Sequence, residues 1–454
     1  MARRHAVAAV LAGAMLALLA ALALVPFDAS TLGRAVLQRA AALTGGTLTA
    51  RSFRLRPLAG LAIEGLEGSL AFTGGRATLS VDRLVLDHRL WRLLLGELAV
   101  DRLLLQRPRL RLVETRTEGR APRPPAVAPA AAGLGRLALR ISRIDVEDGT
   151  IELEAPGQTR PVVVSGFGLQ LRDVAFDGRP AVALAGLSGA GEVRAARIAF
   201  ARADARDVRG SLRVGGGRLS TGAVRFQTAQ GPFEATLDAR LDRLPLAYTL
   251  ALRGEPLDVG SMMTVSGAGA TAGPGAGALQ LDAAGIGTEA TGLTGRGVLR
   301  LQSGALPATP LLQAVERALG RTRLVGARYE ATEAPFRVEG GRVLLDDFQL
   351  RTRDVGMDMV GWASLQGPLE LTVAIHTPRD GLTVDGVTAG ALDLMTDDQG
   401  RVVVTLEVTG TQEQPRVRPD AAALAAQARR GGARTLLDKA GRGLGGLLRR
   451  KPRE

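Results

Sequence analysis

Apolar and polar residues alternate with a period of two along much of this chain, and the longest such stretch covers residues 336–419. This alternation predicts β-strands with one face against an apolar interior and the other face in water. Glycines that favour turns separate the runs at intervals of roughly ten residues, the spacing of a large antiparallel sheet. Four apolar positions of the last long run are candidates to line an apolar groove, namely Val402, Val404, Leu406 and Val408.

The same alternation occurs earlier in the chain. The strand-like runs before residue 180 cover residues 47–56, 61–72, 76–87, 97–106, 109–114, 137–154 and 161–176. Residues 116–135 are rich in Pro and Ala and show no periodicity, which is typical of a linker. The alternation returns after this segment and continues to residue 254. The chain is therefore predicted to be mainly β, and whether the β regions on the two sides of the linker join into one sheet stays open.

One clear helix is predicted inside the β pattern. Thr309 can act as the N-cap, and Pro310 suits the first helical position. Gly320 is placed to end the helix. The apolar stripe between these signals consists of Leu311, Leu312, Val315 and Leu319. Its helical spacing predicts a helix with one buried face.

Residues 6–25 carry no charge, and a run of this length is sufficient to cross a bilayer as a helix. Arg3 and Arg4 precede the run and predict a cytoplasmic N-terminus. The expected location is therefore a bacterial inner membrane, crossed once, with the body of the protein in the periplasm. A cleaved signal peptide is the alternative, because Ala21-Leu22-Ala23 resembles a small-residue cleavage site.

These features divide the chain into consecutive parts. The expected parts are a cytoplasmic tip and transmembrane anchor (1–26), an N-terminal β region with a short helix (27–114), a Pro/Ala-rich linker (115–135), a middle β region (136–265), a C-terminal β region (266–419) and a basic tail, amphipathic or disordered (420–454).

The net charge of +13 is concentrated at the C-terminal end, where nine basic residues and two acidic residues follow position 428. Nearly all basic residues are Arg, which GC-rich coding also produces, so we do not predict a nucleic-acid partner. Three interpretations of the tail stay open. It is a solvated terminus, a helix on an anionic membrane surface, or a contact for a partner protein. The residues expected to contact the membrane surface in the second case are Arg449, Arg450 and Lys451.

No group of residues predicts catalysis. Of the three histidines, His88 and His376 fall in separate strand-like runs, and His5 precedes the membrane segment. Glycines within residues 441–446 match a dinucleotide-binding spacing, but no strand precedes them. The pairs Asp346-Asp347 and Asp397-Asp398 are predicted to lie in turns. Cysteine is absent, which excludes disulfides and thiolate chemistry. We therefore predict no enzyme, no cofactor and no metal site.

The apolar face of the predicted sheet has two interpretations. A second layer can cover it, which gives ordinary closed sandwiches, or it can stay open as a groove. Periodicity alone does not separate these alternatives, because both bury alternate side chains.

The order of several motifs resembles the AsmA-like proteins of Gram-negative bacteria, relatives of the bridge-like lipid-transfer proteins. The similar stretches are the apolar N-terminal segment, ALTGG (42–46), residues 79–113, residues 291–319, residues 334–352 and residues 408–420. The middle of the chain, residues 116–260, is similar only in its alternation.

The resemblance implies an elongated, twisted antiparallel sheet that curls into an apolar trough, with an N-terminal transmembrane helix and a few short helices. It implies a non-enzymatic protein of the inner membrane that supports outer-membrane biogenesis by moving phospholipids. Phospholipids and the inner membrane are then the expected partners, together with outer-membrane or envelope proteins. A scaffold or chaperone for outer-membrane protein assembly is the main alternative, and an envelope hydrolase is a third.

Overall fold

The structure is a computed structural model of the 454-residue chain. It describes residues 27–28 and 46–429, apart from residues 57–59, 73–74, 89–98, 115–138, 155–159, 177–186, 201–202, 243–245, 259–274, 288–289, 321, 365–366, 381, 383–394, 398, 424 and 427–428. The predicted membrane anchor and the basic tail with Arg449, Arg450 and Lys451 lie outside these residues. Within the described part of the chain, no helix is both long and apolar enough to span a bilayer.

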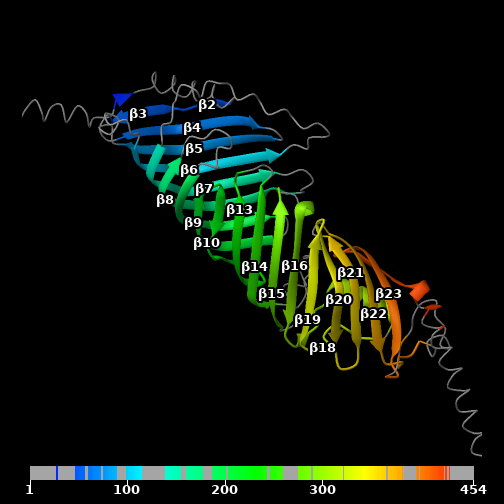
Figure 1. The fold of residues 1–454 in the computed structure, drawn as a ribbon. Helices are drawn as coiled ribbons and strands as arrows, with labels where there is room; N and C mark the ends of the chain where they lie inside the picture. Colours follow the sequence, from blue (N-terminus) through cyan, green and yellow to red (C-terminus); the bar gives the residue numbers. More distant parts are fainter. Residues whose placement is uncertain are drawn as a thin grey trace, which may run out of the picture. The chain divides into compact units, whose positions relative to one another are not determined.

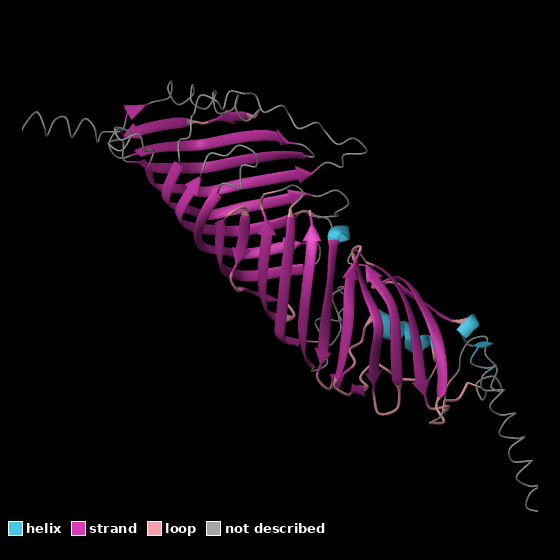
Figure 2. Cartoon of the chain, viewed as in Figure 1, coloured by secondary structure: helices cyan, strands magenta, loops and turns pink. Residues whose placement is uncertain are grey.

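The described chain is mainly β, in mixed but mostly antiparallel sheet (Figures 1 and 2). Its residues group into two compact units. The N-terminal unit contains residues up to Thr228 and the segment Glu234–Thr249, and the C-terminal unit contains Ala229–Phe233 and the residues from Leu250 onward. Each unit has its own arrangement of strands and its own core.

The N-terminal unit is built from strands that pair with their neighbours in the sequence. Each strand from β3 to β10 pairs with the next, β1 and β2 pair with β3 and β4, and β10 also pairs with β11 and β12. The strands are β1 (Phe27–Asp28), β2 (Thr47–Thr49), β3 (Ser52–Arg56), β4 (Gly60–Phe72), β5 (Gly75–His88), β6 (Ala99–Glu114), β7 (Leu139–Glu154), β8 (Val162–Phe176), β9 (Leu187–Phe200), β10 (Ala203–Gly215), β11 (Arg218–Thr221) and β12 (Val224–Thr228). Strands β13 (Gly231–Arg240) and β14 (Ala247–Asp258) have residues in both units.

Strands β6 and β7 pair in parallel, from Ala99 opposite Arg140 to Val113 opposite Glu154. This corrects the expectation of a purely antiparallel sheet. Two parallel strands need a crossover connection of about a dozen residues or more, and residues 115–138 are long enough to provide it. The pairing also answers the question left open by the sequence, because the β regions before and after the linker belong to one sheet.

The C-terminal unit is an antiparallel meander in which β15, β16, β19, β20, β21, β22, β23 and β24 pair in that order. A separate pair, β17 with β18, lies between β16 and β19 in the sequence. The elements are β15 (Ala276–Ile286), the 3-10 helix η3 (Ala290–Gly292), β16 (Leu293–Leu301), β17 (Gly304–Ala305), α4 (Pro310–Ala318), β18 (Arg328–Tyr329), β19 (Thr332–Glu339), β20 (Arg342–Arg351), β21 (Gly356–Ser364), β22 (Pro368–Thr377), β23 (Val402–Thr411) and β24 (Pro415–Pro419).

The predicted helix is confirmed as α4. Thr309 is its N-cap, and the Thr309 hydroxyl accepts a hydrogen bond of 3.1 Å from the Leu312 backbone N–H. Pro310 occupies the first helical position, where its missing N–H costs nothing. Gly320 follows the C-cap with a φ of 72°, a conformation that glycine adopts without steric strain. The helix buries Leu312 and Val315 as its stripe predicts.

A single apolar core fills the C-terminal unit. It contains 22 buried residues among those described, drawn from β16, α4, β18, β19, β20, β21, β22 and β23 and from the segments between them. Helix α4 and the residues after it contribute Leu312, Val315, Leu319 and Leu324 to this core. The Glu316 carboxylate accepts hydrogen bonds from the Leu324 and Val325 backbone N–H groups, at 2.5 and 2.7 Å, and fixes this covering segment.

Candidate functional site: an apolar face on the N-terminal sheet

The strand registers of the N-terminal unit place apolar side chains on one face of the sheet. Residues that pair directly across neighbouring strands project from the same face, so each set of partners forms a row across the sheet. One row contains Ile63, Leu84, Leu105, Val146, Leu169 and Val193, and another contains Leu79, Leu110, Ile151, Val164, Ile198 and Ala205. These rows and their neighbours extend over the seven strands β4 to β10, and we call this surface the apolar face.

Most side chains of the apolar face are partly exposed. The partly exposed members of the two rows include Leu84, Leu105, Leu110, Ile151, Val164, Leu169 and Ile198. The buried cluster of this unit is small and contains Phe53, Ile63, Leu66 and Val81 among the described residues. A surface made of Leu, Ile and Val that remains accessible over several strands is unusual for a soluble sheet and is typical of a binding surface.

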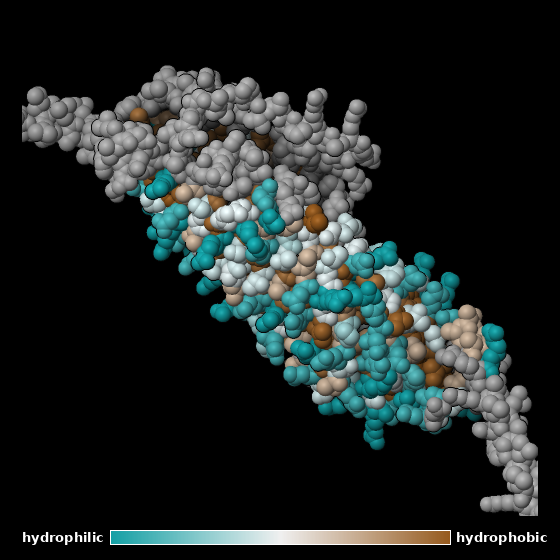
Figure 3. Space-filling view, in the orientation of Figure 1, coloured by the Kyte–Doolittle hydropathy of each residue, from teal (hydrophilic) through white to brown (hydrophobic). Residues whose placement is uncertain are grey.

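The opposite face of the same sheet is polar. Arg111 on β6 donates hydrogen bonds to Glu154 on β7, and Arg197 on β9 donates to Asp204 on β10. A hollow of about 450 Å³ on this side is lined mainly by Thr, Ser, Arg and Glu side chains of β2, β4, β5, β6 and β7. Figure 3 shows one side of the molecule, on which most described residues are hydrophilic and hydrophobic ones are scattered between them. The sheet is therefore amphipathic over most of its area, although the polar face also contains apolar partners, namely Val85 with Leu104 and Val100 with Ile141 and Val174.

The parallel junction between β6 and β7 is held by a buried carboxylate on the polar face. Asp145 accepts hydrogen bonds of 2.8 Å from Arg102 Nε and from Arg143 Nε, while only 3% of its side chain is exposed. Burial raises the pKa of Asp145, but the hydrogen bonds from Arg143 and Arg102 lower that pKa by more, so it lies below its ordinary value. This ion pair joins the two parallel strands β6 and β7.

The groove candidates from the sequence lie elsewhere and are not accessible. Val402, Val404, Leu406 and Val408 are on β23 of the C-terminal unit, with 1%, 0%, 0% and 0% of their surface exposed. They belong to the 22-residue core that α4 and its following segment help to cover. A ligand cannot touch them while this core is intact, so their alternation reports a closed core in this structure. The remaining candidates, Arg449, Arg450 and Lys451, lie outside the described residues.

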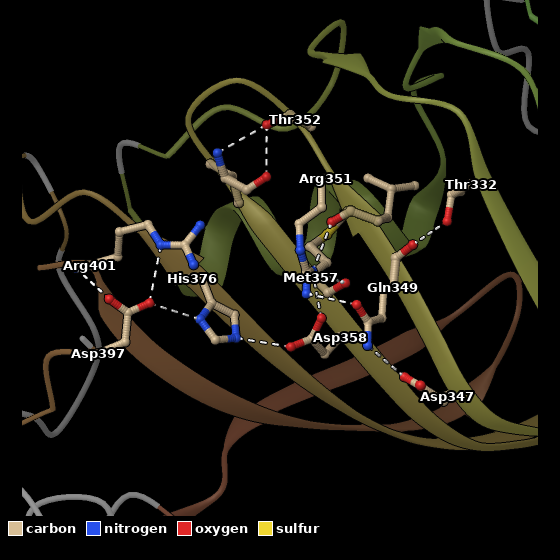
Figure 4. Close-up of polar contacts among 12 residues, drawn as sticks. Thr332, Asp347, Gln349, Arg351, Thr352, Met357, Asp358, His376, Asp397 and Arg401 are labelled. Atoms are coloured by element: carbon tan, nitrogen blue, oxygen red, sulfur yellow. Dashed lines mark hydrogen bonds and ion pairs between the residues drawn. The ribbon is translucent and has the colours of Figure 1, made fainter. Parts of the chain in front are cut away.

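A polar network in the C-terminal unit contains the one histidine whose side chain is described. His376 on β22 lies between two carboxylates, with Nε2 3.0 Å from Asp358 Oδ2 and Nδ1 3.2 Å from Asp397 Oδ2 (Figure 4). Arg351 pairs with Asp358, and Arg401 pairs with Asp397. Burial raises the pKa of Asp397, but hydrogen bonds from the Arg401 and Gln399 backbone N–H groups and from His376 bring that pKa below its ordinary value.

This network ties the turn before β23 to β21 and β22. The described partners of His376 are both carboxylates, and a catalytic histidine would instead need a nucleophile or a substrate proton within reach. Within the described residues, no group of acidic, His or Cys side chains is arranged to hold a metal ion. The arrangement is suited to positioning a loop, and we assign it no chemistry.

The apolar face was not identified from the sequence as the candidate site, although its signal was present. Runs 61–72, 76–87, 97–106 and 109–114 all contain alternating apolar residues, as the run that ends at Val408 does. The alternation does not indicate which segments cover an apolar face. This cover decides which apolar face is accessible.

The fold and the amphipathic sheet define the chain as a mainly β protein with a partly open apolar surface. No family model, no curated protein and no solved structure matches this chain. The functional argument therefore depends on the geometry of the sheet and on the sequence patterns described above.

Proposed function

We propose that this chain is a membrane-anchored periplasmic protein without enzymatic activity, which supports outer-membrane biogenesis by shielding phospholipid acyl chains and letting them move along its N-terminal sheet. The observation that carries the proposal is the apolar face, whose partly exposed rows cross seven consecutive strands, β4 to β10. The proposed lipid surface is therefore in the N-terminal unit and not along residues 402–408.

The physical reason is the cost of exposing an acyl chain to water, about 0.8 kcal/mol for each CH₂ group. An extended acyl chain that lies across the strands would contact several of them at once, because neighbouring strands are about 4.8 Å apart. Movement by one strand then exchanges equivalent apolar contacts and exposes little new hydrocarbon. The zwitterionic or charged headgroup stays in solvent, where its hydration is retained.

The membrane anchor and the periplasmic location are supported by the uncharged segment 6–25 with Arg3 and Arg4 before it. The resemblance of several stretches to AsmA-like proteins supports the role in outer-membrane biogenesis.

The test is site-specific photo-crosslinking in cells with the full-length chain, with one photoreactive residue at a time. Three adjacent pairs compare the faces: Leu105 with Gln106, Ile151 with Glu152, and Leu169 with Gln170. The first member of each pair is on the apolar face and the second is on the polar face. We expect phospholipid adducts at the first member only, and none at Val404, whose side chain is fully buried.

Equal lipid adducts on both faces would indicate non-specific contact with membrane and would contradict the proposal. Protein adducts at the apolar positions, with no lipid adducts, would favour the scaffold function instead. Thin-layer analysis of the released adducts identifies the lipid in the expected case.

A further inference from the structure

Five strands of the N-terminal sheet contain a residue in the left-handed backbone region. Five of these residues are Gly65 on β4 (φ 60°), Arg107 on β6 (47°), Asp148 on β7 (53°), Gly166 on β8 (62°) and Asp207 on β10 (53°). Asp173 on β8 (52°) also has a positive φ, but it lies at a separate irregularity between Arg172 and Ala175. Three of the five are not glycine, and positive φ is sterically unfavourable for a residue with a Cβ atom. Such conformations persist where the surrounding structure requires them.

The five residues lie on one line across the sheet. The ladder between β5 and β6 runs from Arg83 opposite Gln106 to Val81 opposite Pro108 and omits Arg107. The ladder between β9 and β10 omits Asp207 in the same way, between the pairs Arg206–Arg197 and Val208–Ala195. The corresponding interruptions of the β4–β5, β6–β7, β7–β8 and β8–β9 ladders fall at the same level. We call this row of aligned bulges the bulge line.

The alternation of side chains changes phase at the bulge line. On β6 the apolar face is formed by Leu103 and Leu105 before Arg107, and by Pro108, Leu110 and Leu112 after it. The same change from odd to even positions, or the reverse, occurs on every strand from β4 to β10. Each strand thus carries one inserted residue, and without the bulge the side chains beyond it would project from the opposite face.

Burial on the apolar face is deepest beside the bulge line. The row next to it includes Leu66, Val81, Ala195 and Val208, with exposed fractions of 8%, 1%, 5% and 7%. Pro108 and Gly149 of the same row are also buried, whereas the flanking rows are partly exposed apart from Ile63. A bulge bends a strand, and aligned bulges bend a whole sheet. A bend toward the apolar face would cover this row with the two rows beside it.

We propose that the bulge line positions the apolar face. It bends the sheet into two apolar walls that meet at a buried floor, and it keeps the side chains of both walls on one face. Arg107, Asp148 and Asp207 act in this proposal as positioning residues through their backbone conformation. The inference rests on the proposed function for its purpose, since the walls would hold the acyl chain, but its geometry can be tested without lipid.

The chain contains no cysteine, so pairs of introduced cysteines report on chosen contacts alone. Ile151 pairs with Val164 on one side of the bulge line, and Val146 pairs with Leu169 on the other. Directly paired residues on one face are close enough for a disulfide. We would introduce Ile151→Cys with Val164→Cys as the test pair, and Val146→Cys with Leu169→Cys as the control pair.

The decisive substitution is Asp148→Val, because a β-branched residue strongly disfavours positive φ. If β7 loses its bulge while β8 keeps it, residues 151 and 164 project from opposite faces. We expect the disulfide yield of the test pair to fall to background and that of the control pair to persist. Glu152→Val, on the same strand at an ordinary φ, should leave both disulfides unchanged. Retention of both disulfides in Asp148→Val would overturn the inference.

Loss of both disulfides would show that Asp148→Val prevents folding, and a second variant then decides. Glycine accepts positive φ, so the combined change Arg107→Gly, Asp148→Gly and Asp207→Gly should keep both disulfides and a cooperative melting transition. Loss of the test pair in this variant would contradict the inference, because it would show that the side chains and not the backbone conformation are required.

Lipid crosslinking separates this inference from the proposed function. In Asp148→Val we expect photo-crosslinks to lipid to disappear at position 151 and to persist at position 146. If the disulfides change as expected but the unaltered protein forms no lipid adducts, the bulge line is confirmed and the lipid function fails. If lipid adducts form but neither the disulfide yields nor the lipid crosslinks change in Asp148→Val, the lipid function is supported and the inference about the bulge line fails.

Discussion

The same alternation of apolar and polar residues forms a covered core in one unit of this protein and a partly exposed surface in the other. In the C-terminal unit the apolar face of β22 and β23 is fully covered, and Val404, Ile375 and Leu406 have no exposed surface. In the N-terminal unit most apolar residues of β6 and β7 remain partly exposed, although Val100 and Pro108 are buried. Among the described residues the difference lies in the cover, because α4 and the segment after it supply side chains to the C-terminal core. Alternation therefore predicts that a strand has an apolar face, but the cover decides whether that face is a core or a surface.

The largest expected effect is a loss of unfolding free energy when a leucine of each unit is truncated, and the two losses test the comparison. Leu406→Ala removes a fully buried side chain and should lower the free energy of unfolding of the C-terminal unit by about 2–5 kcal/mol. Leu110→Ala removes a partly exposed side chain and should cost clearly less. Urea denaturation measures both changes in the free energy of unfolding, and hydrogen exchange assigns each change to a unit. Equal losses would mean that the apolar face is as closed as the core.

A smaller effect is expected at the parallel junction of the N-terminal sheet. Asp145→Asn keeps the shape of the side chain but removes the charge that pairs with Arg102 and Arg143. We expect the unfolding free energy to fall by about 1–3 kcal/mol, the usual cost of disrupting a buried charged hydrogen bond. The matched control is Glu147→Gln on the same strand, which pairs through a single side-chain hydrogen bond with Gln106. A loss at Asp145 no larger than that at Glu147 would exclude a specific role for the junction.

The same carboxylate predicts a pH dependence. The pKa of Asp145 in the folded protein lies below its ordinary value of 3.8, so folding favours the ionised form. Its contribution to stability is present above that ordinary pKa and is lost as the pH falls through the folded pKa. Unfolding measured at pH 6 and at pH 3 should therefore show a smaller pH effect in Asp145→Asn than in the unaltered protein. An identical pH effect in both would contradict the assignment.

The smallest effect concerns the cover of the C-terminal core. Thr309→Ala removes the N-cap of α4 and should lower the unfolding free energy by about 1 kcal/mol. Thr309→Ser retains a hydroxyl and serves as the control. If the cover is what distinguishes the units, hydrogen exchange should increase at β22 and β23 and not at β6 and β7. Faster exchange in both units would show that the cover has no local role.

Much of the strand pattern could be predicted, because alternation and turn glycines are local signals. The run 161–176 corresponds closely to β8, and the cap, proline and glycine of α4 placed that helix correctly. Asp397 lies in a turn as expected, where its backbone carbonyl accepts a hydrogen bond from the Gly400 N–H. Asp346 and Asp347 were also expected in a turn, and this prediction was wrong. They lie within β20, at an irregularity of its ladder with β21.

The candidate site was harder to predict because its defining features are not local. Residues 97–106 and 109–114 were expected as two strands, and their alternation changes phase at Arg107. In the structure they form the single strand β6, and the phase change is a bulge. In a single sequence a phase change looks like the end of a strand. Only its alignment with the phase changes of β4, β7, β8 and β10 identifies it as part of a row of bulges. The parallel partner of β6 is equally invisible, because periodicity carries no information on strand direction.

The pairing of each strand from β3 to β10 with its sequence neighbour has a consequence for how such a sheet can evolve and fold. Contacts between sequence neighbours make the sheet nearly one-dimensional, so its stability is a sum of local terms, as in repeat proteins. A hairpin inserted at a turn would extend the apolar rows by two strands without disturbing pairs elsewhere. Length is thus an adjustable quantity in this architecture, set by the number of strands and not by any central packing that must be redesigned.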